Sequence, residues 1–353
     1  MKKITILMLV LTFVTSISFN LYSAGAEDIS SQKSKEYVIT PISPEWKNFK
    51  SVDLKNMLNI SVEEAQQMDT ATLLDFVLKY PFLGDIYAFN NPLKAIDFIA
   101  EQFNGLDVLL KREDLKEELI KSYINSSDKI ITQKDSKEID TEERYMQKYR
   151  ESFLSYPTIY NKLSKTEKDT ITSISKKVAT RINTYPLFNE PGTQSPDAIT
   201  YGPGDIIRIG TVFTPLLSMV EVYELEDMSS GDKNVMDNYM DSRYPNATRL
   251  RSATFKYNCH SYAWNSTSTS NKWWMDDPSA YMTDGSYSKT TAAGGWKIFY
   301  TAPGNEHSGI ISSVNGNTVL VTSKWGAYGL YRHEDWDCPY LSPYLNTYWK
   351  LGN

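Results

Sequence analysis

The stretch that decides the fold runs from Tyr257 to Trp264 and reads Tyr-Asn-Cys-His-Ser-Tyr-Ala-Trp. It contains Cys259, one of only two cysteines in the chain, and His260, one of three histidines. The small and aromatic residues after the cysteine favour a short buried helix with Cys259 in its first turn. The positive end of a helix dipole favours a thiolate over a thiol. The stretch therefore predicts a reactive cysteine at the start of a helix.

Three strands are predicted after this helix, and the second opens with a histidine. Their apolar runs cover residues 295–300, 307–314 and 317–322. Asn315-Gly316, between the last two runs, is the sequence signal of a two-residue type I′ hairpin. A histidine at the start of a strand, such as His307, can be held beside a cysteine sulfur as its proton acceptor. This order predicts a Cys259 nucleophile and a His307 base on a small antiparallel sheet.

The segment from Tyr257 to Gly329 resembles the papain-like superfamily of cysteine hydrolases, and especially the CHAP and NlpC-type enzymes that act on bacterial cell walls. In that superfamily a cysteine on a helix precedes a histidine on a strand, which matches Cys259 and His307. A polar residue on the next strand orients the imidazole, often the Asn of an Asn-Ser-Trp-Gly motif. This chain has Ser-Lys-Trp-Gly there, so the resemblance makes Ser323 the third site residue, a departure from the usual Asn, His or Glu.

The hairpin signal and the resemblance disagree about that third residue. A turn at Asn315-Gly316 pairs His307 with Lys324 in an ideal hairpin. Because side chains alternate along a strand, Thr322 and Lys324 would then share the face of the histidine. Ser323 would point away unless a β-bulge intervenes. Ser323 is preferred on the resemblance, and Thr322 and Lys324 remain the alternatives.

The other cysteine and histidines have simpler expected roles. In an exported protein, a disulfide between Cys259 and Cys338 is the alternative to a reactive thiol. Neighbouring residues on a helix point about 100° apart, so His260 is expected to hydrogen-bond locally or to be exposed, and not to act as the base. His333 is expected at the surface. A structural zinc site needs about four closely spaced N or S ligands, so neither a metal nor another cofactor is predicted.

The ends and the charge of the chain indicate where it works. Lys2 and Lys3 precede an apolar run from Ile4 to about Phe19, and Ala24-Gly25-Ala26 supplies the small residues of a signal-peptidase site. Residues 1–26 are therefore predicted to be a cleaved signal peptide, and the mature protein to be secreted without a membrane span. The net charge of −6 argues against nucleic acid as a partner.

Two composition regimes predict an α+β protein with two domains. Residues 27–192 are expected to form a helical domain, with a capping box at Ser61–Glu64 and helices at 69–80, 92–103, 112–125, 142–154 and 165–182. Residues 193–250 are expected to be a linker and β-rich lead-in. Residues 251–353 are expected to be the papain-like catalytic domain, in which a helix carrying the cysteine packs on a small antiparallel sheet.

These features predict a secreted cysteine hydrolase that cleaves an amide bond. Export and the resemblance make peptidoglycan the leading substrate, and a protein substrate is the alternative within the same chemistry. The second class of function is a secreted binding protein on a papain-like scaffold with little catalysis. The helical domain, which contains no cysteine or histidine, is expected to be a spacer or a surface for an unknown protein partner.

Overall fold

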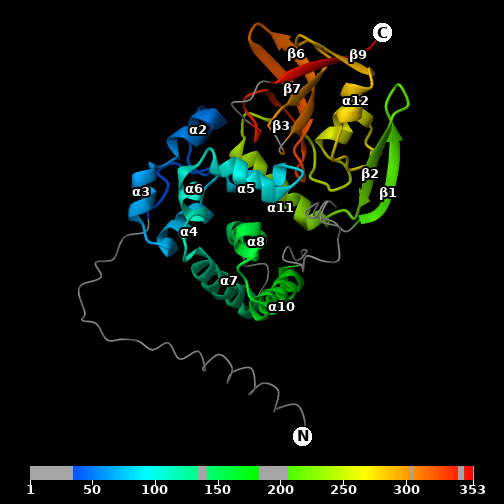
Figure 1. Ribbon diagram of the computed structural model, residues 1–353. Helices are drawn as coiled ribbons and strands as arrows, with labels where there is room; N and C mark the ends of the chain where they lie inside the picture. Colours follow the sequence, from blue (N-terminus) through cyan, green and yellow to red (C-terminus); the bar gives the residue numbers. More distant parts are fainter. Residues whose placement is uncertain are drawn as a thin grey trace, which may run out of the picture. The chain divides into compact units, whose positions relative to one another are not determined.

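The computed structural model describes residues 35–133, 141–182, 206–302, 304, 306–340 and 346–352 (Figure 1). The predicted signal peptide lies outside these residues, as does the predicted boundary around residues 193–204. Lys35–Asn353 form one compact unit. As expected, none of the helices in the described ranges combines the length and the apolar character needed to cross a membrane.

The first part of the unit is helical, and its helices begin where the sequence supplies caps. Ser61 accepts a hydrogen bond from the Glu64 backbone N–H, and Asp69 accepts one from that of Thr72. In Figure 1 helices α7, α8 and α10 are gathered together, and α7 packs against both of the others. The elements are η1 (Trp46–Asn48), α2 (Ser51–Met57), α3 (Val62–Gln67), α4 (Thr70–Leu78), η2 (Leu83–Ala88), α5 (Pro92–Ala100), α6 (Asn104–Leu110), α7 (Leu115–Thr132), α8 (Thr141–Ser155), α9 (Pro157–Tyr160) and α10 (Lys165–Ile182).

The second part is built on antiparallel sheets, which confirms the α+β class. The elements are β1 (Ile206–Phe213), β2 (Met219–Leu225), α11 (Ser230–Arg243), β3 (Thr248–Arg251), η4 (Ser261–Asn265), α12 (Ser279–Thr283), β4 (Tyr287–Thr290), β5 (Lys297–Tyr300), β6 (His307–Asn315), β7 (Thr318–Lys324), β8 (Leu330–Glu334) and β9 (Thr347–Leu351). β1 and β2 form a hairpin, and the other strands form a seven-stranded sheet in the order β3-β8-β7-β6-β5-β9-β4. The short helical segment that carries Cys259 packs on β6 and β7.

One hydrophobic core joins the helices to the sheet. Its buried members include Trp46 and Phe82 from the first part and Trp325 from the second. The short helix η2 links the two parts by hydrogen bonds: the Tyr328 hydroxyl donates to the Gly84 carbonyl oxygen at 2.8 Å, and other contacts join η2 to Tyr244 and Ala327. The composition change thus marks a change of secondary structure inside one folding unit.

The turn between β6 and β7 lies one residue beyond the predicted position. Asn315 pairs with Thr318, so the two turn residues are Gly316 and Asn317. Gly316 has a φ of +58°, and Asn317 is not among the residues with positive φ. A type I′ turn needs positive φ at both central residues, whereas a type II′ turn needs it only at the first, where glycine is favoured. The expected Asn315-Gly316 turn is therefore wrong.

A register shift within this hairpin decides which side chains share a face. The β6–β7 pairing shifts by one residue directly after Ile311, which pairs with Val321. His307 lies four residues before Ile311, and Ser323 lies two residues after Val321, so alternation places all four on one face of the sheet. Residues 322 and 324 lie on the opposite face. The register derived from the turn signal is wrong, because the turn and the bulge both displace it.

Candidate functional site

Cys259 lies in the first turn of a helical segment, as the sequence predicts. Residues 259 and 260 are α-helical and lead directly into the π-helical η4. Asn258 caps this segment: its side-chain oxygen accepts hydrogen bonds from the backbone N–H groups of Ser261 and Met275, each at 3.1 Å. Trp264 anchors the other end in a small apolar cluster that includes Val222 of β2. Capping and packing together fix the position of the thiol.

The Cys259 sulfur is buried against the start of β6. The backbone N–H groups of Ser308 and His260 point to the sulfur. Ser308 lies two residues before Ile310, where the β6–β7 pairing ends. Cys259 is 2% exposed. Burial raises the pKa of the thiol to about 12, although the two N–H groups and the charge of Lys324 act to lower it. In this closed arrangement the thiol is neutral.

Both cysteines are free, so the structure does not contain the disulfide that was the alternative reading of the sequence. Cys338 is also buried, and its thiol donates to the Asp335 carbonyl oxygen at 3.5 Å. Burial raises its pKa to about 12. The two thiols therefore have similar pKa values, and the feature that distinguishes Cys259 is its place in a capped helix beside a histidine strand.

His307 is fully buried, and neither of its ring nitrogens has a hydrogen-bond partner among the residues that the structure describes. Its ring stacks on that of Tyr340, with 3.4 Å between centroids and 8° between planes. Burial, and then the nearby His333 and His260, hold the pKa of this imidazole well below its ordinary value. The residue after it, Ser308, supplies an N–H to the Cys259 sulfur, but no hydrogen bond joins His307 to that thiol.

Ser323 orients a different histidine. Its hydroxyl lies 2.8 Å from Nε2 of His333 and accepts a hydrogen bond from the indole N–H of Trp325 at 3.1 Å. Nδ1 of His333 lies 2.7 Å from the Glu334 carbonyl oxygen, so this nitrogen carries the proton and Nε2 accepts from the serine. His333 is 1% exposed. The expectation that it lies at the surface is wrong, because alternation along β8 turns it into the core beside Trp325.

A second network of the same composition supports the cysteine helix. The Ser308 hydroxyl accepts from the indole N–H of Trp264 at 2.8 Å and lies 2.7 Å from Nδ1 of His260. The His260 ring also stacks on Phe299 of β5. Two Trp-Ser-His networks thus flank His307, which has no such partner. Sequence reasoning missed both networks because their members are brought together by strand register and not by a local motif.

The two alternatives for the third site residue also have other partners. Thr322 shares a hydrogen bond of 2.8 Å with Ser312. The Lys324 ammonium donates to the carbonyl oxygens of Thr254 and Gly326, at 2.9 and 2.5 Å. Neither side chain therefore orients His307. The structure joins Cys259 to the start of β6 through Ser308, whose side chain faces the cysteine helix. Alternation turns His307 to the other face of the sheet, that of Ser323, so the two predicted site residues are not in contact in this arrangement.

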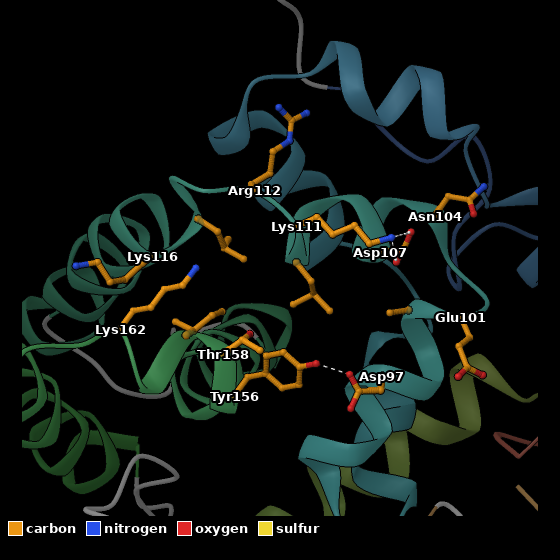
Figure 2. A pocket seen from close by; sticks show the side chains of 14 residues that line it. Asp97, Glu101, Asn104, Asp107, Lys111, Arg112, Lys116, Tyr156, Thr158 and Lys162 are labelled. Atoms are coloured by element: carbon orange, nitrogen blue, oxygen red, sulfur yellow. Dashed lines mark hydrogen bonds and ion pairs between the residues drawn. The ribbon is translucent and has the colours of Figure 1, made fainter. Parts of the chain in front are cut away.

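A pocket of about 590 Å³ lies among the helices α5, α6, α7 and α9, and none of the predicted site residues lines it. Figure 2 shows the Tyr156 hydroxyl directed at Asp97 and the Lys111 ammonium directed at Asp107. Its floor contains apolar side chains such as Ile159. No short motif marks these residues, because they come from several helices far apart in the sequence.

Comparison of the chain with protein-family models, with curated proteins and with solved structures gives no match. In the part of the chain that the structure describes, no group of three or more His, Cys, Asp or Glu side chains is arranged to hold a metal ion.

Proposed function

We propose that this protein is an exported, papain-like cysteine hydrolase that cleaves amide bonds, with Cys259 as nucleophile and His307 as base. The observation that carries the proposal is a thiol at a capped helix start beside the strand that begins with His307, a buried imidazole for whose two nitrogens the described residues supply no hydrogen-bond partner. A free, neutral imidazole is the form that can accept a proton. The strand order after the cysteine supports the same proposal.

The proposed reaction first needs a movement at the start of β6, because alternation turns the His307 ring away from the face of the sheet on which Cys259 lies. His307 takes the thiol proton, and the Cys259 sulfur attacks the carbonyl carbon to form a tetrahedral intermediate. Backbone N–H groups at the helix start and at Ser308 are available to hold its oxyanion. His307 then gives the proton to the leaving amine, and water hydrolyses the acyl-enzyme. Because Ser323 is hydrogen-bonded to His333, the proposed catalytic group is a dyad.

Turnover in this proposal requires an opening of the site. Cys259 and His307 are both buried, and Tyr340 covers the imidazole. Movement of Tyr340 away from His307 would hydrate both groups and bring their pKa values back towards the ordinary range. Peptidoglycan is the proposed substrate, since the chain carries a predicted export signal and resembles wall-acting enzymes. A protein substrate would use the same chemistry.

The proposal is tested with the purified mature protein, by muropeptide analysis of digested peptidoglycan and by cleavage of peptide substrates. We expect Cys259→Ala to abolish hydrolysis without unfolding the protein. Cys338→Ala is the matched control, because it removes a second buried thiol of similar pKa and should keep the activity. Equal activity in the wild type and Cys259→Ala would reject the role of Cys259.

A second candidate is a binding protein with little catalysis. The observation in its favour is that the pocket lies among the helices, while the thiol is almost fully buried. Binding of peptidoglycan fragments that is equal in the wild type and Cys259→Ala, without any product formed by the wild type, would favour this candidate. In that case a substitution in the pocket, such as Lys162→Ala, should weaken the binding.

A further inference from the structure

Lys324 is a buried cation without an anionic partner. Its side chain is fully buried, and its ammonium donates only to the carbonyl oxygens of Thr254 and Gly326 among the contacts of the described residues. None of the ion pairs in this part of the chain includes Lys324. Burial without a counter-charge destabilises the protonated form of a lysine. A lysine kept in such a place, next to a proposed nucleophile, calls for an explanation.

The ammonium lies against the segment that leads to the cysteine. Thr254, whose carbonyl oxygen it binds, and Tyr257, whose ring centroid lies 5.3 Å away, both belong to the five residues before Cys259. The cysteine helix packs on β7, the strand that ends at Lys324. Lys324 therefore projects to the face of the sheet that carries the thiol, opposite to the face of Ser323.

The nearby carboxylates are already used by other cations. Asp227 pairs with Lys233 at 2.6 Å, and Asp237 pairs with Arg249 at 2.9 Å. Both also accept backbone N–H bonds, from Phe255 and Ala253 respectively.

The remaining titratable groups around the thiol carry no negative charge at neutral pH. The buried ones are Tyr257, Tyr340, His260 and His307, and burial raises the pKa of each of the two phenols. The exposed carboxylate of Asp277 is the exception, and its charge acts on His260 and not on Lys324. The two imidazoles are neutral, because burial lowers their pKa values. Of the three groups whose negative charge would stabilise the Lys324 ammonium, namely Cys259, Asp227 and Asp237, only the Cys259 sulfur lacks another cation partner among the described residues.

We propose that Lys324 is the counter-ion of the Cys259 thiolate and so sets the pH at which the sulfur becomes reactive. When the S–H bond breaks and its proton passes to a base, the ammonium neutralises the charge left on the sulfur. Burial lowers the pKa of Lys324 to about 7, and among the charges that act against this lowering that of Cys259 is the largest. Lys324 is a positioning residue in this account, since it need not touch the substrate.

The inference rests on the proposed function for its use in turnover, but ionisation of the thiol can be measured without any substrate. The experiment is alkylation of the full mature chain by iodoacetamide across a pH series, with peptide mapping by mass spectrometry to separate Cys259 from Cys338. The midpoint of the rate against pH reports the pKa of the reacting thiolate. A change in how often the site opens alters the rate but not this midpoint.

We expect Lys324→Met to raise the Cys259 midpoint by one pH unit or more, which means at least a tenfold slower reaction below the midpoint. Lys324→Arg should keep most of the effect, because it keeps the charge. Lys297→Met is the control, since Lys297 is a half-buried lysine on neighbouring β5 whose pKa is lowered by burial, and it should leave the midpoint unchanged. Lys324→Gln, which still donates to the two carbonyls, replaces Lys324→Met if that variant does not fold.

An unchanged midpoint in a folded Lys324→Met or Lys324→Gln variant would overturn the inference, as would an equal shift in Lys297→Met. A shifted midpoint in a protein that hydrolyses no substrate would instead reject the proposed function and leave the role of Lys324 intact. The two failures are therefore distinguishable.

Discussion

At the scale of single residues, the three buried histidines differ in whether hydrogen bonds compensate the loss of hydration of the imidazole. His260 and His333 each contact a serine hydroxyl that also accepts an indole N–H. His307 has the same degree of burial but no partner for either nitrogen. A buried polar group without a hydrogen bond destabilises a protein by about 1–3 kcal/mol. Such a cost is expected at a functional residue and not at a structural one.

We predict that His307→Phe raises the free energy of unfolding by about 1–3 kcal/mol while it abolishes hydrolysis. Phenylalanine can keep the stack on Tyr340 and removes two unsatisfied nitrogens. His333→Phe is the control, because it breaks the bonds to Ser323 and Glu334 and should lower stability by a similar amount. Urea unfolding curves for the three proteins decide between these outcomes, and equal destabilisation by both substitutions would contradict the prediction.

At the scale of elements, the turn between β7 and β8 fixes the sheet to the helical part. Gly326 has a φ of +49°, and a Cβ there would overlap the backbone carbonyl groups of Tyr87 and Ala88. The same turn donates the Ala327 N–H to the Tyr87 carbonyl oxygen at 3.1 Å. The end of β7, with Ser323 and the residues after it, therefore takes its position from a contact with η2.

We predict that Gly326→Ala lowers the free energy of unfolding by about 3 kcal/mol or more, because it combines unfavourable φ with a backbone clash. Gly295→Ala separates the two causes: Gly295 has a φ of +86°, but a Cβ there would meet nothing within 4 Å. It should cost only the backbone strain of about 1 kcal/mol. Thermal unfolding of both variants tests this, and a similar loss in the two would show that the contact with η2 adds nothing.

Neighbouring residues predict the helices and strands of this protein well, whereas the contacts between distant residues are predicted less well. A few neighbouring residues are enough to predict the helix at Cys259, the strand before His307 and the strand that begins with it. The same holds for the caps at Ser61 and Asp69. The β6–β7 register does not, because a one-residue change in the turn and a bulge both displace the pairing. The partner of Ser323 follows from that register. The resemblance puts Ser323 on the face of His307 and the turn signal puts it on the other, and neither indicates His333 as its partner.

At the scale of the whole molecule, the helical and β-rich parts depend on each other. The absence of cysteine and histidine from the helical part suggests a separate module when only the sequence is considered. In the structure, tyrosine hydroxyls from the β-rich part bind backbone carbonyls of the helical part, as Tyr328 does at Gly84 and Tyr239 at Pro81. Composition reports on secondary structure, whereas these contacts between distant residues determine the folding unit.

The same shared core buries all three histidines as neutral groups, and this predicts how stability depends on pH. Burial lowers the pKa of His260 to about 3 and that of His333 to about 4, and it holds that of His307 well below its ordinary value. In the unfolded chain these side chains titrate near pH 6.5. Between pH 4 and 6.5 the unfolded chain therefore binds more protons than the native protein, and acidification favours unfolding.

Asp276 acts in the opposite sense: although the residue is exposed, desolvation of its carboxyl by the surrounding chain raises its pKa to about 6, and the native state gains a proton first. On unfolding near pH 5.5 the three histidines take up about one proton each and Asp276 releases about one, so the chain takes up about two protons in total. We predict that the free energy of unfolding falls by about 3 kcal/mol per pH unit there, at about 1.4 kcal/mol per proton. Urea unfolding between pH 5 and 7 measures this slope.

The variant His307→Phe should reduce the net proton uptake by about one proton, because phenylalanine cannot be protonated in either state. An unchanged slope in that variant would mean that His307 is not held neutral in the folded protein, and the free imidazole that the proposed base requires would then be absent.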